Sequence, residues 1–331
     1  MGFSKNTASL QSLEKGQSMT EAKKPQGMSA EQWEDIKNIP FEMRKRLLSM
    51  WEGMQKNPAP DFETIPLVAI STPAQLPLWP EAARGTPNSF LRSALFAAIQ
   101  GKTRRLLKGE TIASQGNYSV AFRGEQLDQS DLDTWEQAAH LVKSQPLGNI
   151  CMFHGNAFLK AIGRSNGKAN YKWLNDSLER LVACAVVIKC GKKVFTGSLV
   201  SSFVRDDDTR LFKVTLDPDT LKLFGSCDWS SIEWAERLAL KGKPLALWLH
   251  GYIASHAALI PVKVETLRDL SGSRTQAKKH FTTALKRAFA ELAPFGITAA
   301  FEGDLVLIQK TPTATQARHL IQKKTTRKKK P

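Results

Sequence analysis

Few residues in this chain of 331 have the types and spacing that catalysis requires. Gln100-Gly101-Lys102-Thr103 is similar to the end of a phosphate-binding loop, but Phe96 occupies the position of the earlier glycine that such a loop needs. A polar turn after a helix explains these residues, so ATP hydrolysis has no support.

Metal-dependent cleavage has weak support as well. The six histidines include no His-x-His pair, and the tyrosines available as nucleophiles are Tyr118, Tyr171 and Tyr252. The aspartates at 206–208 offer carboxylates to a metal, but such a run between two strands is more often a solvated turn. We therefore expect no catalytic residue, no bound metal and no cofactor.

The cysteines and the apolar segments indicate a cytoplasmic protein. The four cysteines form no C-x-x-C pair, which disfavours structural zinc and is typical of reduced thiols. No apolar run follows the first basic residues, so we expect no secretory signal. Residues 244–262 carry no formal charge, but prolines and histidines interrupt them, which favours a buried helix running into a strand over a membrane span.

Net charge indicates the class of partner. Lys and Arg number 47 against 31 Asp and Glu, a formal charge of +16, which favours nucleic acid first and an acidic membrane surface second. Residues 318–330 contain seven basic residues and no acidic one. Such a tail adds salt-sensitive affinity for DNA, or serves only to keep the protein in solution.

Cationic and hydroxyl side chains gather on two expected amphipathic helices, over residues 171–184 and 275–292. On the second they lie opposite an apolar stripe, as suits a helix in a major groove, although an ordinary solvated face has the same pattern. The candidate DNA-binding residues are Lys168, Asn170, Lys172, Asn175, Arg274, Thr275, Lys278, Lys279, Thr282 and Lys286.

The elements that position these helices follow from hydrophobic periodicity and turn residues. After the first helix come three β-rich runs at 186–189, 193–203 and 211–216; after the second comes a hairpin at 297–301 and 305–309. Helices over 231–241 and 244–255, a strand at 261–264 and a helix at 265–270 precede the second helix. Helix, helix, strand, helix, helix, hairpin is the winged-helix order, and the pattern occurs twice.

The predicted fold class is therefore α+β, with two tandem winged-helix domains. The predicted divisions are residues 1–28 disordered, 29–56 a short helical segment, 57–87 a proline-rich linker, 88–226 the first domain, 227–311 the second domain and 312–331 a basic tail. Within the first domain, the apolar spacing over 88–98 predicts a helix.

One short motif lies in the predicted linker. Gln75, Leu76, Leu78 and Trp79 follow the pattern of the bacterial sliding-clamp-binding pentapeptide, Gln-Leu-(Ser/Asp)-Leu-Phe. In that pentapeptide the Gln amide bonds at the groove edge, and the leucine and the aromatic ring enter an apolar pocket. Pro77 and the Trp in place of Phe depart from the pattern. The alternative is that Leu78 and Trp79 pack on the first domain.

The order of these parts resembles plasmid replication initiators of the TrfA type. The resemblance covers residues 75–309: the pentapeptide, the run at 87–96 with its Arg-Ser-Ala-Leu-Phe sequence, Gly124-Glu125-Gln126-Leu127 before a helix with Trp135, and Leu178-Glu179-Arg180-Leu181 in the first recognition helix. It implies two winged-helix domains that bind origin repeats (iterons) as monomers in equilibrium with dimers. It also implies opening of an adjacent A·T-rich duplex, with contact to its single strand.

The expected function is thus that of a non-enzymatic initiator with a place in plasmid copy control. Its expected partners are iteron DNA, the sliding clamp, the host initiator, the replicative helicase and a second copy of itself. A transcriptional repressor of its own promoter, built from the same domains, is the alternative; a nicking enzyme is a weaker one. A repressor has no need of the clamp motif, and a nicking enzyme would cleave DNA in the presence of a divalent metal.

Overall fold

The computed structural model describes residues 24, 30–37, 44–45, 48–49, 76–101, 103–144, 148–226, 228–313 and 316–318. The chain divides into two units, Met1–Ile70 and Ser71–Pro331. In the first unit, α1 (Ala30–Lys37) confirms a helix within the segment predicted over 29–56. The disorder predicted over 1–28, most of the linker and most of the tail lie outside the described residues.

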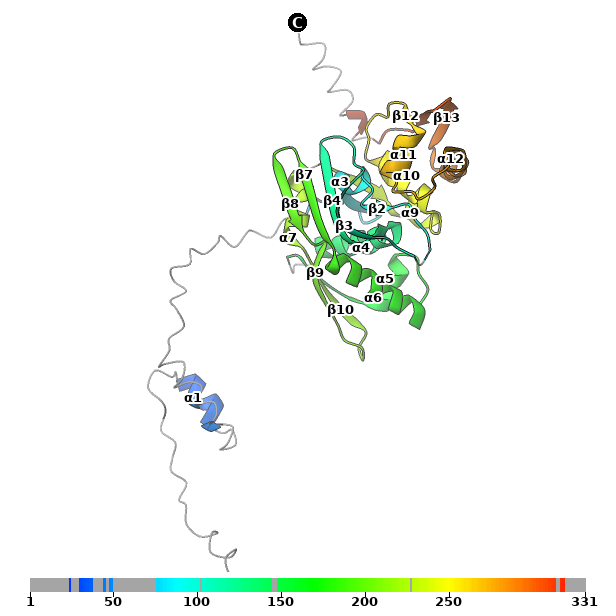
Figure 1. The fold of residues 1–331 in the computed structure, drawn as a ribbon. Coiled ribbons are helices and arrows are strands. Elements are labelled where there is room, and N and C mark those ends of the chain that lie inside the picture. The colour runs from blue at the N-terminus through cyan, green and yellow to red at the C-terminus, as the bar shows by residue number, and fades with distance from the viewer. Residues whose placement is uncertain are drawn as a thin grey trace, which may run out of the picture. The chain divides into compact units, whose positions relative to one another are not determined.

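The second unit contains two hydrophobic cores, which are coloured cyan to yellow-green and yellow to red in Figure 1. The first core draws its side chains from residues 76–234 and the second from residues 240–308. Both cores combine helices with antiparallel strands, as the predicted α+β class requires.

The first core is enclosed by elements that span residues 83–233. These are β1 (Ala83–Pro87), α3 (Asn88–Leu91), β2 (Phe96–Ala97), β3 (Leu106–Ile112), β4 (Tyr118–Glu125), β5 (Leu127–Asp128), α4 (Gln129–Ser144), β6 (Ile150–His154), α5 (Gly155–Ala161), α6 (Lys168–Ala183), β7 (Ala185–Cys190), β8 (Lys193–Gly197), β9 (Val200–Arg205), β10 (Leu211–Leu216), α7 (Pro218–Leu221), α8 (Leu223–Ser226) and β11 (Trp229–Glu233).

Two sheets position helix α6. The antiparallel sheet β3-β4-β7-β8 buries alternate residues such as Val120, Phe122 and Ile188, as expected of strands with one face on a core. The sheet β6-β10-β9 lies beside α6. The helix buries Leu174, Leu178 and Leu181 at intervals of four and three residues, and the opposite side faces solvent.

The second core repeats this arrangement. Helix α9 (Trp234–Ala239) places Trp234 in the first core and leads into the second. The elements of the second core are α10 (Pro244–Ala254), β12 (Val262–Lys263), α11 (Val264–Leu270), α12 (Lys278–Leu292), the 3-10 turn η2 (Ala293–Phe295), β13 (Thr298–Glu302) and β14 (Leu305–Gln309). The sheet order β12-β14-β13 corresponds to β6-β10-β9, with a helix pair between the first strand and the hairpin in each case. In the first copy, β7 and β8 are inserted between the second helix and the hairpin.

Several predicted boundaries are wrong because tertiary pairing outweighs local pattern. The helix expected over 88–98 ends at Leu91, since Phe96 and Ala97 pair with Leu127 and Asp128 as parallel strands. The helix expected from residue 231 begins at Trp234, because residues 229–233 form β11.

Residues 76–87, which were predicted as part of the linker, belong to the folded part of the second unit. β1 pairs with β11 along its whole length, from Ala83 with Glu233 to Pro87 with Trp229. Leu76 and Trp79 are buried in the first core. Proline-rich sequence favours extended backbone, and extended backbone suits a linker and a strand equally.

Buried polar contacts join the two halves of the second unit. The Arg237 guanidinium on α9 is 1% exposed and lies 2.6 Å from the Asp133 carboxylate and 3.1 Å from the Glu136 carboxylate on α4. Its Nη1 atom donates to Leu247 O on α10, in the second half, at 3.5 Å. Burial raises the pKa of Glu136 to about 7, although Arg237 opposes the shift. Tyr252 Oη on α10 donates to Gln115 Oε1 at 2.6 Å. A Cβ atom at Gly251 would lie 2.8 Å from Leu91, so α10 approaches the first core closely.

Within the described residues, no helix combines the length and apolarity that crossing a bilayer requires. Most of the uncharged stretch at 244–262 forms the eleven-residue helix α10, followed by a loop and the start of β12. This is the arrangement that its interrupted apolar pattern favoured.

Candidate nucleic-acid interface

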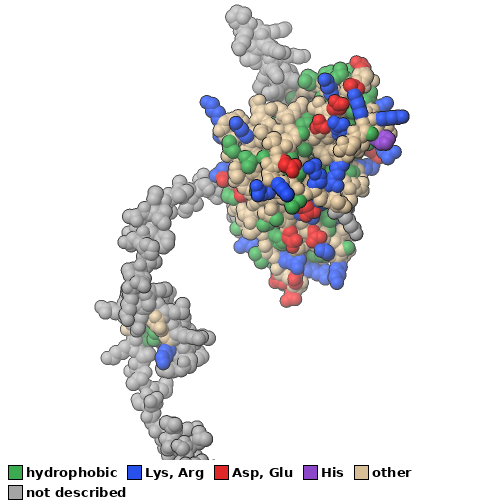
Figure 2. Space-filling model, in the orientation of Figure 1, with side chains coloured by type: hydrophobic (Ala, Val, Ile, Leu, Met, Phe, Trp, Pro, Cys, Tyr) green, Lys and Arg blue, Asp and Glu red, His purple; other side chains and the backbone are tan. Residues whose placement is uncertain are grey.

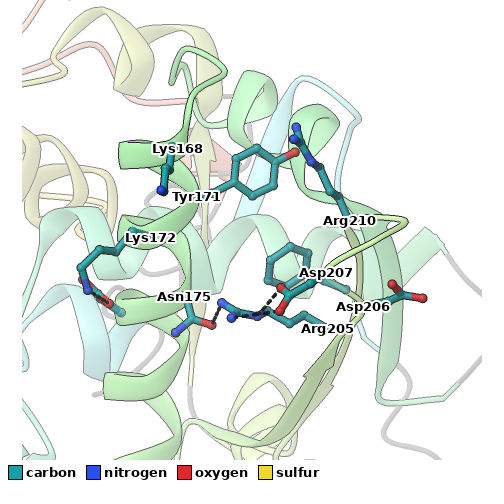
Figure 3. Close-up of a pocket in the computed structure, with 10 residues that line it drawn as sticks. Lys168, Tyr171, Lys172, Asn175, Arg205, Asp206, Asp207 and Arg210 are labelled. Carbon is teal, nitrogen blue, oxygen red and sulfur yellow. Dashed lines mark hydrogen bonds and ion pairs between the residues drawn. The ribbon is translucent and has the colours of Figure 1, made fainter.

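Helix α6 presents a polar face beside the hairpin of β9 and β10. Lys168, Tyr171, Lys172 and Asn175 line a hollow of about 420 Å³ between the helix and the hairpin (Figure 3). The buried leucine stripe fixes which side of α6 turns outward, so the register of the helix sets this polar face. The predicted candidates Lys168, Lys172 and Asn175 are thereby brought together.

The structure gives Asn170 a local role. Its amide nitrogen donates to Ser165 O at 2.8 Å and to Ser165 Oγ at 3.0 Å, and its amide oxygen accepts from Arg164. The Arg164 guanidinium stacks 3.3 Å from the centroid of the Trp173 ring. Asn170 thus closes the turn between α5 and α6.

Two arginines at the ends of the hairpin turn were missed in the sequence. Arg205 Nη1 donates to Asn175 Oδ1 at 2.7 Å, and the Arg205 Nε atom lies 2.9 Å from Asp207 Oδ1. The Arg210 guanidinium lies 5.2 Å from the centroid of the Tyr171 ring, and Arg210 adopts φ 57°, which is uncommon for a residue other than glycine. The sequence signal that could have identified them is an arginine on each side of a predicted hairpin turn.

The aspartates between these arginines form the turn that the sequence predicted. Asp206 accepts hydrogen bonds from the backbone N–H of Asp208 at 2.9 Å and of Thr209 at 3.0 Å. These bonds lower the pKa of Asp206. Among the residues described, no group of three or more His, Cys, Asp or Glu side chains could hold a metal ion.

Helix α12 presents the corresponding face in the second core. It buries Phe281, Leu285 and Leu292, and basic side chains gather over it at the right of Figure 2. Lys279 is exposed on this helix. Lys278 forms an ion pair with Asp304, in the turn of the β13–β14 hairpin.

Two further candidates of α12 have partners within this face. The Lys286 ammonium lies 5.2 Å from the centroid of the Phe301 ring on β13. Thr282 Oγ1 donates to Lys278 O at 2.9 Å, which is a bond along its own helix.

Arg274 and Thr275 lie before α12, which begins at Lys278 rather than at residue 275. Arg274 Nη1 donates to Thr103 O at 2.8 Å, and Nη2 donates to Gln126 Oε1 at 2.9 Å. Both partners belong to the first half of the unit. Arg274 therefore joins the two halves, and a DNA contact there stays a prediction.

The described part of the clamp-like motif is mostly packed into the first core. Leu76 is 8% exposed, Trp79 is 4% exposed and Leu78 is 90% exposed. The Trp79 ring stacks on Phe224 with centroids 5.5 Å apart. Gln75 lies outside the described residues. Trp79 therefore packs on the first domain, the alternative that the sequence left open, whereas Leu78 does not.

The family described as TrfA protein matches residues 69–310, which include both cores and both polar helices. The chain belongs to the TrfA family.

One relative in this family is the plasmid replication initiator protein TrfA of Escherichia coli, which is 26% identical to this chain over 227 residues. The match covers 66% of this chain and 59% of that protein, so it spans less than two thirds of the relative's length. Two crystal structures of domains 2 and 3 of RctB are similar to this TrfA-family chain, with TM-scores of 0.47 and 0.44 and sequence identities of 14% and 15%. Each match covers 68% of this chain, and the two matches cover 98% and 97% of the respective RctB chains.

Proposed function

We propose that this protein is a plasmid replication initiator that binds iterons with two winged-helix domains, promotes opening of a neighbouring A·T-rich duplex and recruits host replication proteins. The observation that carries the proposal is the repeated arrangement of a polar helix beside a hairpin, on α6 with β9–β10 and on α12 with β13–β14. Membership of the TrfA family supports it.

The two polar helices would each enter a major groove, and the hairpins would flank them. Asn175 offers a side chain that can read a base edge, whereas Lys168, Arg210 and Lys279 offer cations to phosphates. Because Arg237 and Arg274 join the halves, the helices would address neighbouring sites as one body. Bound in tandem repeats, such bodies would bend the duplex and make melting of a weak segment easier. No step in this scheme needs a catalytic residue.

The deciding experiment is footprinting of the full chain on the DNA that flanks its own gene, with permanganate probing of unpaired thymines. We expect protection of repeated sites and reactive thymines in a neighbouring A·T-rich segment. Lys168→Ala with Lys279→Ala should weaken protection at every repeat. Protection of a single promoter site without reactive thymines would instead identify a repressor, and DNA cleavage with a divalent metal would identify a nicking enzyme.

We also propose contact with the sliding clamp through residues 75–79, with Leu78 as the side chain already available because it is 90% exposed. Trp79 would have to leave its core position to enter a clamp pocket, which would limit the affinity to micromolar values. Leu78→Ala should abolish clamp binding while iteron binding and thermal stability remain unchanged. Retained clamp binding would reject the motif. Contacts with the host initiator, the helicase and a second copy of the chain belong to the same proposal.

A further inference from the structure

Asn175 is held at both ends of its amide by groups from two different elements, and Figure 3 shows the contact with Arg205. Its Oδ1 atom accepts a hydrogen bond from Arg205 Nη1 on β9 at 2.7 Å. Its Nδ2 atom donates to Glu179 Oε1, one turn further along α6. The amide plane therefore cannot turn freely about its last side-chain bond.

The chemistry of the two partners also fixes which end of the amide is which. A guanidinium has only donors and an ionised carboxylate has only acceptors. A half-turn of the amide would set its N–H against the Arg205 N–H and its oxygen against the Glu179 oxygen. A single orientation of Asn175 is therefore stable.

Arg205 is itself held from the hairpin turn. Its Nε atom lies 2.9 Å from Asp207 Oδ1, and its Nη2 atom lies 3.5 Å from Asp207 Oδ2. These contacts turn the guanidinium so that Nη1 points at Asn175. Asp206 shapes the turn through backbone hydrogen bonds, which leaves the Asp207 carboxylate available for Arg205.

We propose that Arg205 and Glu179 are positioning residues that hold Asn175 in the one orientation that reads adenine in the major groove. An asparagine amide recognises adenine by accepting from N6–H and donating to N7, a pattern that a flipped amide would reverse. Each end of the amide retains a second hydrogen-bonding position for the base. The inference rests on the proposed function, because it assigns one base contact within sequence-specific DNA binding.

The competing role for Arg205 is a phosphate contact. A phosphate contact strengthens binding to all sequences alike and adds about 0.9 to the slope of log affinity against log salt. A positioning residue instead changes the preference at one base pair and leaves the others unchanged. The two roles therefore differ in a quantity that can be measured directly.

The experiment selects bound duplexes from a randomised pool with the full chain, then measures affinity for every single-base change in the selected site. Asn175→Ala should remove the preference for A·T at one position and so identify the base pair that Asn175 reads. Arg205→Met and Glu179→Ala should each lower that preference at least fivefold, with other positions unchanged. Arg205→Lys keeps a donor near the same place and should restore part of the preference. Arg210→Met is the matched control: as a proposed phosphate contact it should lower affinity for all sequences alike and leave the preference intact.

A uniform loss of affinity in Arg205→Met, with the preference retained, would overturn the inference and make Arg205 a phosphate contact only. Loss of the same preference in Arg210→Met would overturn it as well, since a general disturbance of the hairpin would then explain both. If Asn175→Ala leaves every preference unchanged, Asn175 reads no base. If the unmodified chain selects no sequence at all, the proposed function fails, and this inference fails with it. Circular dichroism melting of each variant separates these outcomes from unfolding.

Discussion

The Trp79 side chain makes contacts on several sides. Its Nε1–H donates to His140 Nδ1 at 3.1 Å, and the other ring nitrogen of His140 lies 2.6 Å from Glu81 Oε1. His140 is therefore neutral, with its proton on Nε2, and burial lowers its pKa. A Cβ atom at Gly85 would lie 2.4 Å from the Trp79 ring, so the glycine makes room for the indole.

Replacing Trp79 with Ala should destabilise the protein by about 3–5 kcal/mol, because it removes a buried aromatic ring and leaves a cavity. Leu78→Ala is the matched control and should change the free energy of unfolding by less than about 0.5 kcal/mol, since that side chain is exposed. Urea unfolding of both variants checks the difference. Equal effects would mean that Trp79 adds nothing to the core.

The spacing of Gln75, Leu76, Leu78 and Trp79 predicted a partner site but could not show where each side chain points. Leu76 and Trp79 face the core because the strand after them pairs with β11, and that partner lies far along the chain. Which of these residues are buried and which are exposed depends on this pairing. No local pattern in the sequence predicts the pairing.

At the scale of elements, the C-terminal end of α10 shows how a helix end can join segments. Its last carbonyl groups receive hydrogen bonds from the side chain of the adjacent His256 and from side chains of distant segments. These are His256 to Tyr252 O, Lys310 to Ile253 O, Gln316 to Ala254 O and Arg92 to Ser255 O. Cations suit the negative end of the helix dipole.

This cluster predicts a loss of stability on acidification. Burial and the nearby Arg92 cation lower the pKa of His256 to about 4, compared with about 6.5 in the unfolded chain. The His256 ring therefore takes up about one proton on unfolding between these values, and its contribution to stability falls as the pH drops from 6.5 towards 4. Glu136, whose pKa is raised to about 7, contributes in the opposite direction. His256→Gln should therefore increase the urea midpoint at pH 4.5 relative to that at pH 7, when compared with the unmodified chain. The same ratio of midpoints in both proteins would show that His256 makes no such contribution.

Helix α12 predicts unequal roles for neighbouring lysines. Lys279 is exposed, whereas Lys278 is already paired with Asp304. Lys279→Ala should reduce the slope of log affinity against log salt by about 0.9, the effect of one lost phosphate contact. Lys278→Ala should change the slope by less, because its charge is partly neutralised before DNA binds. Fluorescence anisotropy titrations at several salt concentrations measure both slopes. A larger change for Lys278 would contradict the assignment.

The two polar helices could be predicted from hydrophobic periodicity, because their leucine and phenylalanine stripes are local sequence signals. Arg205 and Arg210 do not, since their role depends on the hairpin turning back beside α6 after the inserted β7 and β8. The three aspartates between them predict the turn, but no local pattern predicts that the flanking arginines lie beside α6. The pairing of Arg274 with the first half is likewise a contact across the fold.

At the scale of the whole molecule, Arg237 lies where the two halves meet, because it pairs with buried carboxylates of α4 and also donates to Leu247 O on α10. Arg237→Met should cost about 3–5 kcal/mol, since it leaves the Asp133 and Glu136 carboxylates buried without their cation. Lys243→Ala, which breaks the more exposed pair with Glu291, should cost less than about 1 kcal/mol. Chemical denaturation of both variants provides the comparison. Equal costs would mean that the buried cluster does not hold the halves together.

The repeated order of helices and hairpins was predictable across the molecule, because each copy carries its own periodic segments. The boundary between the halves was not. Residues 229–233 complete the first half through β1, and the predicted second domain began before them. Strand pairing over such a distance leaves no mark in either short segment.

The pairing of β1 with β11 has a consequence for the newly made chain. A ribosome releases β1 early, together with Leu76 and Trp79, but the strand that covers it emerges only after all of α4 to α8. Until then the first half has an open edge and an incomplete aromatic cluster around Trp79, which Trp229 later joins. Nascent chains that stop before Trp229 should therefore be sensitive to protease at residues 76–87, and those that extend past Glu233 should be resistant.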